Sequence, residues 1–335
     1  MKAWDSVGLI INPKAGRGFP ESAHAAVSVL AALRPRQILT GPGQLGAEAL
    51  SKAEFPNVTV LPVTAAEGRA QTQELASAIA TKSISTLVVI GGDGTLADAA
   101  CVLINTPNFP PLLGIGVGST NAGTLVTCRA KDLSRFDPTH LKVISLRALM
   151  AQSGGRTVGL GFNDCVLGFT VVGTLDGVLL DLDAAARFSG KTVAGQVQSV
   201  GTRQTRVERI GPDGVVEIAS GLRVATVVVG LAEREFFAKA ITGGICLASL
   251  VKAPAGCLVA DQPLVRIKIQ PGQVLSLPPI TSTYLTFAEH HRIRVRGVRT
   301  GTALCVDGNP VQLLGPADLV EFGVTAEVVQ SLQLQ

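Results

Sequence analysis

The sequence contains one carboxylate set among three glycines, in the run Gly91-Gly92-Asp93-Gly94-Thr95. The run follows the apolar segment Leu87 to Ile90 and precedes a helical pattern that we expect to begin near Leu96. Glycines let the backbone approach an anionic group, and the carboxylate can bind Mg²⁺ or take a proton from an attacking hydroxyl. The alternative is a tight turn in which Asp93 only caps the helix. Because such a turn needs no more than two glycines, we interpret the run as functional.

A second glycine-containing loop lies near the start of the chain. It reads Asn12-Pro13-Lys14-Ala15-Gly16-Arg17-Gly18 and follows the apolar run Val7 to Ile11. Backbone N–H groups, two cations and a following helix N-terminus suit a phosphate group. Glycine and proline also make ordinary turns, and Lys14 and Arg17 are equally consistent with solvated surface charges.

The third loop is Gly116-Val117-Gly118-Ser119-Thr120-Asn121-Ala122, which we expect to leave a strand and enter a short helical run. Its hydroxyls and amide suit the ribose or phosphates of a nucleotide, although Ser119 or Thr120 would also serve as an ordinary N-cap.

Short Val, Ile and Leu runs alternate with Ala-rich helical stretches up to about Ala130, which predicts a parallel sheet covered by helices. Strands are predicted at Val7 to Ile11, Ile38 to Thr40, Val58 to Val63, Leu87 to Ile90 and Leu112 to Val117. Helices are predicted at Glu21 to Leu33, Leu45 to Ala53, Gly68 to Ala80 and Thr95 to Ile104. Ligands of open parallel sheets gather beyond the carboxyl ends of the strands, so the three loops are expected to converge on one ligand.

After about Asp137 the sequence changes to short β-branched runs broken by Gly and Pro, which predicts an antiparallel β-domain. Possible helices there are Val178 to Phe188 and Glu233 to Ala240. The predicted fold class is therefore an N-terminal α/β parallel-sheet domain followed by an antiparallel, β-sandwich-like domain. We place the nucleotide-binding domain at 1–136 and the substrate domain at 137–318, with 319–335 returning to the first domain.

Composition excludes several classes of protein. The 335 residues are 47% hydrophobic and 16% charged, which favours folded domains over disorder. A net charge of +4 with one Trp and one Tyr argues against a nucleic-acid partner. The sequence has no uninterrupted apolar run of about 20 residues, so we expect no insertion into a membrane. The six scattered cysteines and the absence of an apolar leader favour free thiols in a reducing cytoplasm.

These loops resemble the three nucleotide-facing segments of the NAD kinase and diacylglycerol kinase superfamily. Two later segments extend the resemblance: Phe162 to Val166 is similar to the Asn-Glu segment of NAD kinases, and Cys305 to Asn309 to the late Asp-Gly segment of both branches. Within the superfamily the chain is most similar to predicted ATP-NAD kinases of the acetoin-catabolism protein X type.

The resemblance implies a kinase that uses ATP and Mg²⁺ on a small-molecule hydroxyl in a cleft between two domains. Asp93 would be the catalytic base or metal-organising carboxylate. The implied nucleotide-binding residues are Asn12, Lys14, Gly16, Gly91, Gly92, Gly94, Thr95, Gly118, Ser119, Thr120 and Asn121. Asn163, Asp164 and Asp307 would bind the acceptor, although Asp307 is equally consistent with a β-turn carboxylate. We also expect a homo-oligomer.

The acceptor and donor stay open at this point. NAD is the leading acceptor, but the tyrosine-containing segment of NAD kinases is missing between Gly243 and Gly256, and Asp164 replaces the usual glutamate. The alternatives are a lipid kinase acting on diacylglycerol or a sphingoid base, and a nucleotide-binding regulator without catalysis. Polyphosphate is an alternative donor to ATP.

Overall fold

A computed structural model describes residues 4–55, 57–65, 68–104, 106, 109–118, 121, 123–175, 178–232, 253–264 and 279–335. The chain divides into two units. Unit 1 consists of Met1–Arg147 and Glu327–Gln335, and unit 2 is Ala148–Ala326. Two long strands, β7 (Leu141–Ser153) and β20 (Leu319–Leu334), pass from one unit into the other.

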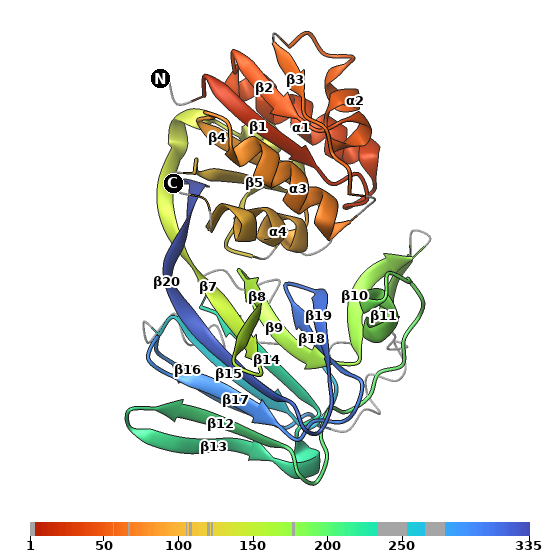
Figure 1. The fold of residues 1–335 in the computed structure, drawn as a ribbon, viewed down its shortest axis with the longest axis vertical. Coiled ribbons are helices and arrows are strands. Elements are labelled where there is room, and N and C mark those ends of the chain that lie inside the picture. The colour runs from red at the N-terminus through yellow and green to blue at the C-terminus, as the bar shows by residue number, and fades with distance from the viewer. Residues whose placement is uncertain are drawn as a thin grey trace. The chain divides into compact units, whose positions relative to one another are not determined.

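Unit 1 is built on a parallel sheet in the order β3-β2-β1-β4-β5, with β6 parallel to β5 (Figure 1). Its strands are β1 (Ser6–Ile11), β2 (Gln37–Thr40), β3 (Val58–Val60), β4 (Thr86–Gly91), β5 (Leu112–Gly116) and β6 (Val126–Arg129). Its helices are α1 (Phe19–Leu33), α2 (Ala47–Leu50), α3 (Arg69–Ala80) and α4 (Asp93–Ile104), with single 3₁₀ turns η1 (Gly43–Leu45), η2 (Ala130–Arg135) and η3 (Pro138–His140). The end of β20 adds a parallel partner to β5 through Ser331 and Leu112.

Strand alternation decides which helix covers which face of this sheet. Leu9 of β1 belongs to the same buried cluster as Val29 of α1. The next residue back, Gly8, faces Ile79 of α3, and Gly114 of β5 faces Leu96 of α4. Because successive strand residues point to opposite faces, α1 covers one face and α3 with α4 cover the other.

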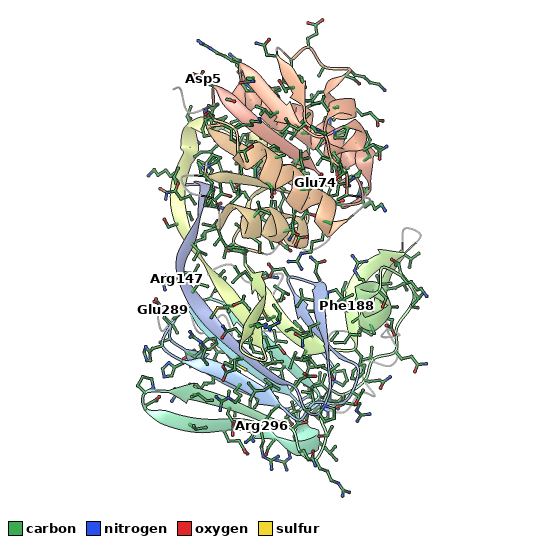
Figure 2. All side chains as sticks on the ribbon, in the orientation of Figure 1. Asp5, Glu74, Arg147, Phe188, Glu289 and Arg296 are labelled. Atoms are coloured by element: carbon green, nitrogen blue, oxygen red, sulfur yellow. The ribbon has the colours of Figure 1, made fainter. Side chains whose placement is uncertain are left out.

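The loop after β3 is tied to α3 by one carboxylate. Glu74, labelled on α3 in Figure 2, accepts the N–H groups of Thr64 at 2.8 Å and Ala65 at 2.6 Å. These hydrogen bonds lower the pKa of Glu74 from its ordinary value.

Unit 2 is antiparallel. One sheet has the order β16-β15-β14-β9-β18-β19; a second contains β13-β12-β17-β20, with β7 pairing β20 and β8; and β10 pairs with β11 alone. The remaining elements are β8 (Arg156–Gly161), β9 (Asp164–Gly168), β10 (Thr170–Leu175), β11 (Val178–Asp183), α5 (Ala184–Phe188), β12 (Arg206–Gly211), β13 (Gly214–Ser220), η4 (Gly221–Arg223), β14 (Thr226–Leu231), β15 (Ala255–Ala260), β16 (Ser282–Phe287), β17 (Arg292–Arg296), β18 (Thr302–Val306) and β19 (Asn309–Leu314).

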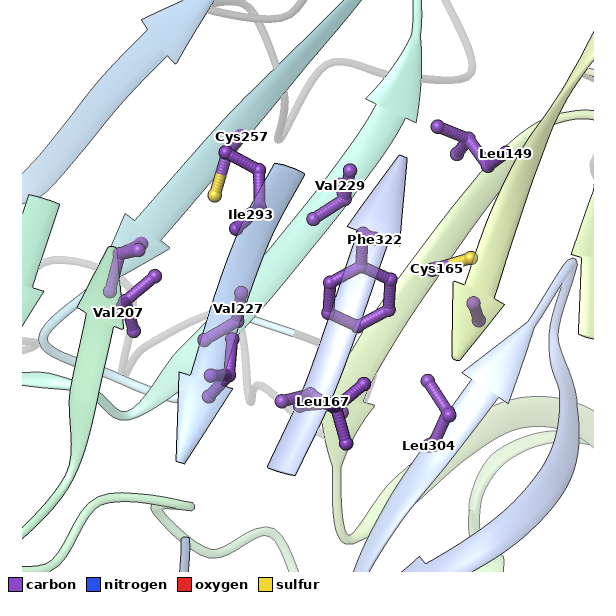
Figure 3. Packing of buried hydrophobic residues seen from close by; sticks show 14 of the residues in the cluster. Leu149, Cys165, Leu167, Val207, Val227, Val229, Cys257, Ile293, Leu304 and Phe322 are labelled. Atoms are coloured by element: carbon purple, nitrogen blue, oxygen red, sulfur yellow. The ribbon is translucent and has the colours of Figure 1, made fainter. Parts of the chain in front are cut away.

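A single hydrophobic cluster joins the two larger sheets of unit 2. Phe322 and Ile293 come from the second sheet, and Cys165, Val229 and Cys257 from the first (Figure 3). Residues from facing sheets sharing one core make a β-sandwich. Burial raises the pKa of the Cys257 thiol to about 12, so this cysteine is a protonated core residue.

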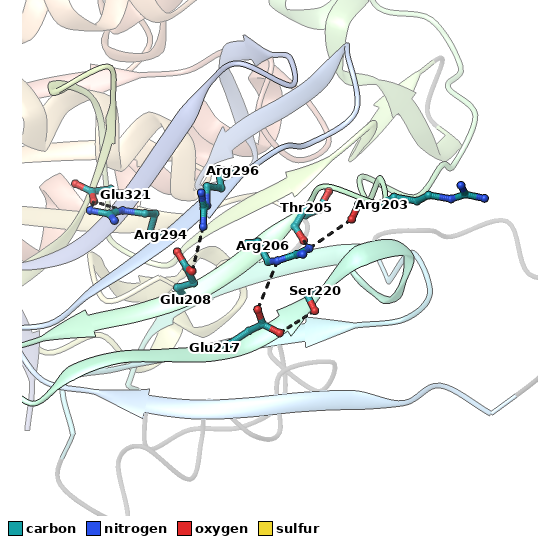
Figure 4. Close-up of polar contacts among 9 residues, drawn as sticks. All are labelled: Arg203, Thr205, Arg206, Glu208, Glu217, Ser220, Arg294, Arg296 and Glu321. Atoms are coloured by element: carbon teal, nitrogen blue, oxygen red, sulfur yellow. Dashed lines mark hydrogen bonds and ion pairs between the residues drawn. The ribbon is translucent and has the colours of Figure 1, made fainter.

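The other face of the β12–β17–β20 sheet carries ion pairs between neighbouring strands. Arg294 bonds Glu321 at 2.8 Å and Arg296 approaches Glu208 at 3.4 Å (Figure 4). Opposite charges on adjacent strands specify the pairing of this half-exposed surface.

The predicted fold class is confirmed, with three local corrections. Helix α4 begins at Asp93, not near Leu96, because Asp93 already forms the first helical turn. The third loop does not enter a helix over its described residues; β-branched Val126 and Thr127 instead begin β6, which pairs with β5. Residues 178–188 are a strand followed by a five-residue helix, because Val178–Asp183 pairs with β10. The helix predicted at 233–240 lies outside the described residues.

Candidate functional site

The carboxyl ends of β1, β4 and β5 lie side by side. Ile11 pairs with Ile90 across β1 and β4, and Gly91 pairs with Gly116 across β4 and β5. The three chemistry-bearing loops therefore leave the sheet at one edge, as the strand pattern predicts.

Asn12 joins the first loop to the second. Its Nδ2 donates to the hydroxyl of Thr95 at 2.7 Å, and its backbone N–H donates to the Ile90 carbonyl at 2.9 Å. Its Oδ1 accepts the N–H of Lys14 at 3.0 Å, which sets the turn at the end of β1. Asn12 is therefore committed to holding loops together, and the side chain of Lys14 itself is exposed.

The second and third loops meet backbone to backbone. The Val117 N–H donates to the Gly91 carbonyl at 2.9 Å. A Cβ added to Gly118 would lie 2.9 Å from the Cα of Gly92, whereas a Cβ on Gly92 would meet nothing nearer than 3.6 Å. Gly118 is thus required for the close approach, and Gly92, which is half-buried, keeps part of its backbone accessible to a ligand.

Gly16 brings the first loop against the third. Its φ is +58°, and an added Cβ would lie 2.0 Å from the carbonyl oxygen of Val117. No side chain fits at that distance from a backbone atom. The carboxylate of Glu21 then accepts the N–H of Arg17 at 2.8 Å and fixes the loop at the start of α1.

Asp93 is the first residue of α4 and is half-buried. Its Oδ1 accepts the N–H of Gly123 at 2.9 Å, so the segment after the third loop holds the carboxylate in one orientation. The start of a helix favours negative charge. Gly94 and Thr95 lie in the same first turn, where the Thr95 N–H donates to Gly92 at 3.0 Å.

Asn121 has a buried acceptor atom. Its φ is +48°, its Nδ2 donates to the Gly118 carbonyl at 2.6 Å, and its Oδ1 has no hydrogen-bond partner among the described residues. The Asn121 side chain also occupies the space in which Gly116 would carry a Cβ. A buried amide oxygen gains from a donor supplied by a ligand. Ser119 and Thr120, predicted as nucleotide-binding, lie outside the described residues.

In unit 2, Asp307 holds the segment that contains Asn163 and Asp164. Its Oδ2 accepts the Phe162 N–H at 2.7 Å, and its Oδ1 accepts those of Asn163 at 2.8 Å and Asp164 at 3.0 Å. With Gly308 it forms the two-residue β18–β19 turn, where both residues have positive φ. Burial raises the pKa of Asp307 to about 8, while the three N–H bonds act to lower it.

Sequence reasoning missed Gly123 and the ion pair between Arg69 of α3 and Asp98 of α4. Arg69 Nε lies 2.9 Å from Asp98 Oδ1. Burial raises the pKa of Asp98 to about 6, and the nearby Arg69 charge partly counters this. A charged residue on an otherwise apolar helix, as in Leu96-Ala97-Asp98-Ala99-Ala100, was the available signal for Asp98.

The donor set fits a magnesium nucleotide. No group of three or more His, Cys, Asp or Glu side chains that could hold a metal occurs in the described part of the chain. Mg²⁺ in phosphoryl-transfer sites is held by one or two carboxylates together with phosphate oxygens and water. The carboxylate of Asp93 suits such an ion, and the neighbouring glycine backbone suits a phosphate chain.

Comparison with known proteins finds a family model that matches the first part of the chain. The family model described as the diacylglycerol kinase catalytic domain matches residues 6–134, which contain all three loops. Residues 6–134 are thus similar to a diacylglycerol kinase catalytic domain. The chain also shares its fold with solved structures of this superfamily.

One relative and two solved structures are similar to this chain over nearly its whole length. An uncharacterized protein of Archaeoglobus fulgidus is 26% identical over 318 residues, covering 95% of this chain and 96% of its own length. A presumed diacylglycerol kinase from Bacillus anthracis superposes with a TM-score of 0.54 at 15% identity, over 99% of this chain and 98% of that one. The structure of yeast NADH kinase complexed with NADH superposes with a TM-score of 0.52 at 14% identity, over 99% of this chain and 83% of that one. No helix in the described residues is long and apolar enough to cross a membrane.

Proposed function

We propose that this protein is a kinase that transfers the terminal phosphoryl group of ATP to a hydroxyl of a small molecule. The observation that carries the proposal is the convergence of the three loops, with Asp93 fixed by Gly123 at their meeting point. Phosphoryl transfer depends mainly on positioning and charge stabilisation, which such a rigid cluster supplies.

In this proposal the phosphates of ATP lie along the backbone of Gly91, Gly92 and Gly94, with Lys14 as a counter-charge. Asp93 would accept the proton of the attacking hydroxyl or would hold the Mg²⁺ ion. The acceptor oxygen forms a bond to the terminal phosphorus as the bond from that phosphorus to the bridging oxygen breaks, and ADP leaves. Mg²⁺ supplies neutralisation of the phosphate charge.

Asn163 and Asp164 are the proposed acceptor-binding residues, carried on the segment that Asp307 holds. Their resemblance to the Asn-Glu segment of NAD kinases makes NAD the first acceptor to test. A second candidate, diacylglycerol, is favoured by the family match over 6–134. Since that match covers the proposed nucleotide-binding residues, it bears more on the donor than on the acceptor.

Incubation with γ-labelled ATP and Mg²⁺ tests the proposal, with NAD and with diacylglycerol in mixed micelles as parallel acceptors. We expect label in one of the two products. Replacing ATP by polyphosphate identifies the donor. If ATP binds but no label reaches NAD or diacylglycerol, the result would contradict a kinase acting on either acceptor. It would favour a nucleotide-binding regulator.

A further inference from the structure

The last strand of the chain contacts the segment that holds Asp93. The side-chain Nε2 of Gln333 donates to the carbonyl of Thr124 at 3.1 Å and to the hydroxyl of Ser331 at 2.8 Å. Thr124 is the neighbour of Gly123, whose N–H binds the Asp93 carboxylate. One hydrogen bond therefore joins residue 333 to the segment on which the orientation of Asp93 depends.

The identity of this side chain is chemically constrained. A carbonyl oxygen only accepts hydrogen bonds, so the atom opposite Thr124 is a donor, and the amide of Gln333 uses both of its N–H bonds on two different acceptors. A glutamate has the same shape but would bring two acceptor oxygens together with the carbonyl. The arrangement needs the amide rather than a polar side chain of similar size.

The surrounding backbone is anchored independently of Gln333. Ser331 is fully buried and pairs with Leu112 of β5, and the hydroxyl of Thr127 donates to the Leu332 carbonyl at 2.5 Å. Because these contacts hold the strand, loss of the Gln333 side chain releases the bond to Thr124 and the bond to Ser331 but leaves the strand in place.

We propose that Gln333 is a positioning residue for Asp93, acting through the 123–124 segment. The inference rests on the proposed function for its effect on turnover, but the contact it describes is measurable without turnover. Gln333 touches neither nucleotide nor acceptor in this assignment. Its removal should therefore reduce kcat and leave the KM for ATP nearly unchanged.

The experiment compares Gln333→Glu and Gln333→Ala with the control Gln335→Ala, whose side chain is exposed two residues further along. We expect kcat to fall about fivefold in both Gln333 variants, the rate equivalent of one net hydrogen bond, with the KM for ATP within about twofold. Exchange of the Gly123 amide hydrogen, followed by NMR, should accelerate by a similar factor while amides of β1 and β4 keep their rates. Gln335→Ala should behave as wild type.

An active wild-type enzyme with unchanged kcat and Gly123 exchange in both Gln333 variants would overturn the inference. So would a uniform rise in exchange across unit 1, because that would show general loosening. If wild type transfers phosphate to no acceptor, the proposed function fails, whereas selective acceleration of Gly123 exchange would still support the tie to residue 333.

Discussion

The side-chain amide of Asn12 donates a hydrogen bond to the hydroxyl of Thr95 over 2.7 Å, although the two residues are 83 positions apart in the sequence. This bond joins the loop after β1 to the loop after β4. Both residues were expected to contact a nucleotide directly, and the structure shows that they also contact one another. The contribution of this hydrogen bond to stability can therefore be measured without a ligand.

A double-mutant cycle with Asn12→Ala and Thr95→Val should reveal coupling of about 1 kcal/mol in the free energy of unfolding, as for a typical net hydrogen bond. The measurement is urea denaturation of the two single variants, the double variant and wild type. Additive effects within about 0.3 kcal/mol would show that the bond does not stabilise the folded protein.

Asp93→Asn should reduce phosphoryl transfer by about 10²–10⁴-fold, the usual range for a removed acid–base group. The amide oxygen of asparagine can still accept the Gly123 N–H, so Tm should change little. Asp132→Asn, a carboxylate in the exposed η2 turn of the same unit, is the matched control. Full activity of Asp93→Asn would refute the assigned role.

Gly16→Ala should destabilise the protein and weaken ATP binding, because the new methyl group would overlap the Val117 carbonyl. Gly43→Ala is a close control. Gly43 has φ +52° against +58° for Gly16, but nothing lies within 4 Å of its added Cβ. The control isolates the backbone cost of positive φ, about 1 kcal/mol. Equal losses in the two variants, measured by thermal unfolding and ATP titration, would mean that the loop contact contributes nothing.

Asp307→Asn should cost about 1–3 kcal/mol of stability, since an amide has one acceptor oxygen for three N–H donors. Asparagine tolerates the positive φ of this position, so the turn itself should survive. If the Asp307 carboxylate positions Asn163 and Asp164, the KM for the acceptor should rise in this variant while the KM for ATP stays constant. A change confined to the KM for ATP would contradict that separation.

Asp98 gives stability a defined pH dependence. Its pKa is about 6 in the folded protein and about 3.9 in an unfolded chain, so between these values the folded state binds more protons. Stability therefore falls as pH rises from about 4 to 6, by about 3 kcal/mol in total, and is constant with respect to this group above that window. Asp98→Asn should remove this slope from urea midpoints measured across pH. An unchanged slope would show that another group is responsible.

The sequence predicts features that are encoded locally. The apolar runs Val7 to Ile11 and Leu87 to Ile90 are enough to place β1 and β4, and the glycine-containing loops after them mark the proposed functional edge of the sheet. The predicted fold class is confirmed for the same reason, since each β-branched run in the second half carries its own strand signal.

The remaining features depend on contacts between distant residues. Nothing near Gly123 in the sequence indicates a bond to Asp93, and the bond from Gln333 to Thr124 spans 209 positions. The helix predicted after the third loop was wrong because pairing of Val126 with Gly114 overrides local helical propensity. Predicted ligand roles for individual residues stay predictions until nucleotide binding is measured.

Unit 1 is discontinuous in sequence, and this affects how the protein is made. The ribosome must synthesise all of residues 148–326 before Ser331 can pair with Leu112 at β5. Domains usually fold in order of synthesis, but the sheet of unit 1 gains this strand partner only after unit 2 has been synthesised. During synthesis β5 therefore lacks this partner until residue 331 has been made.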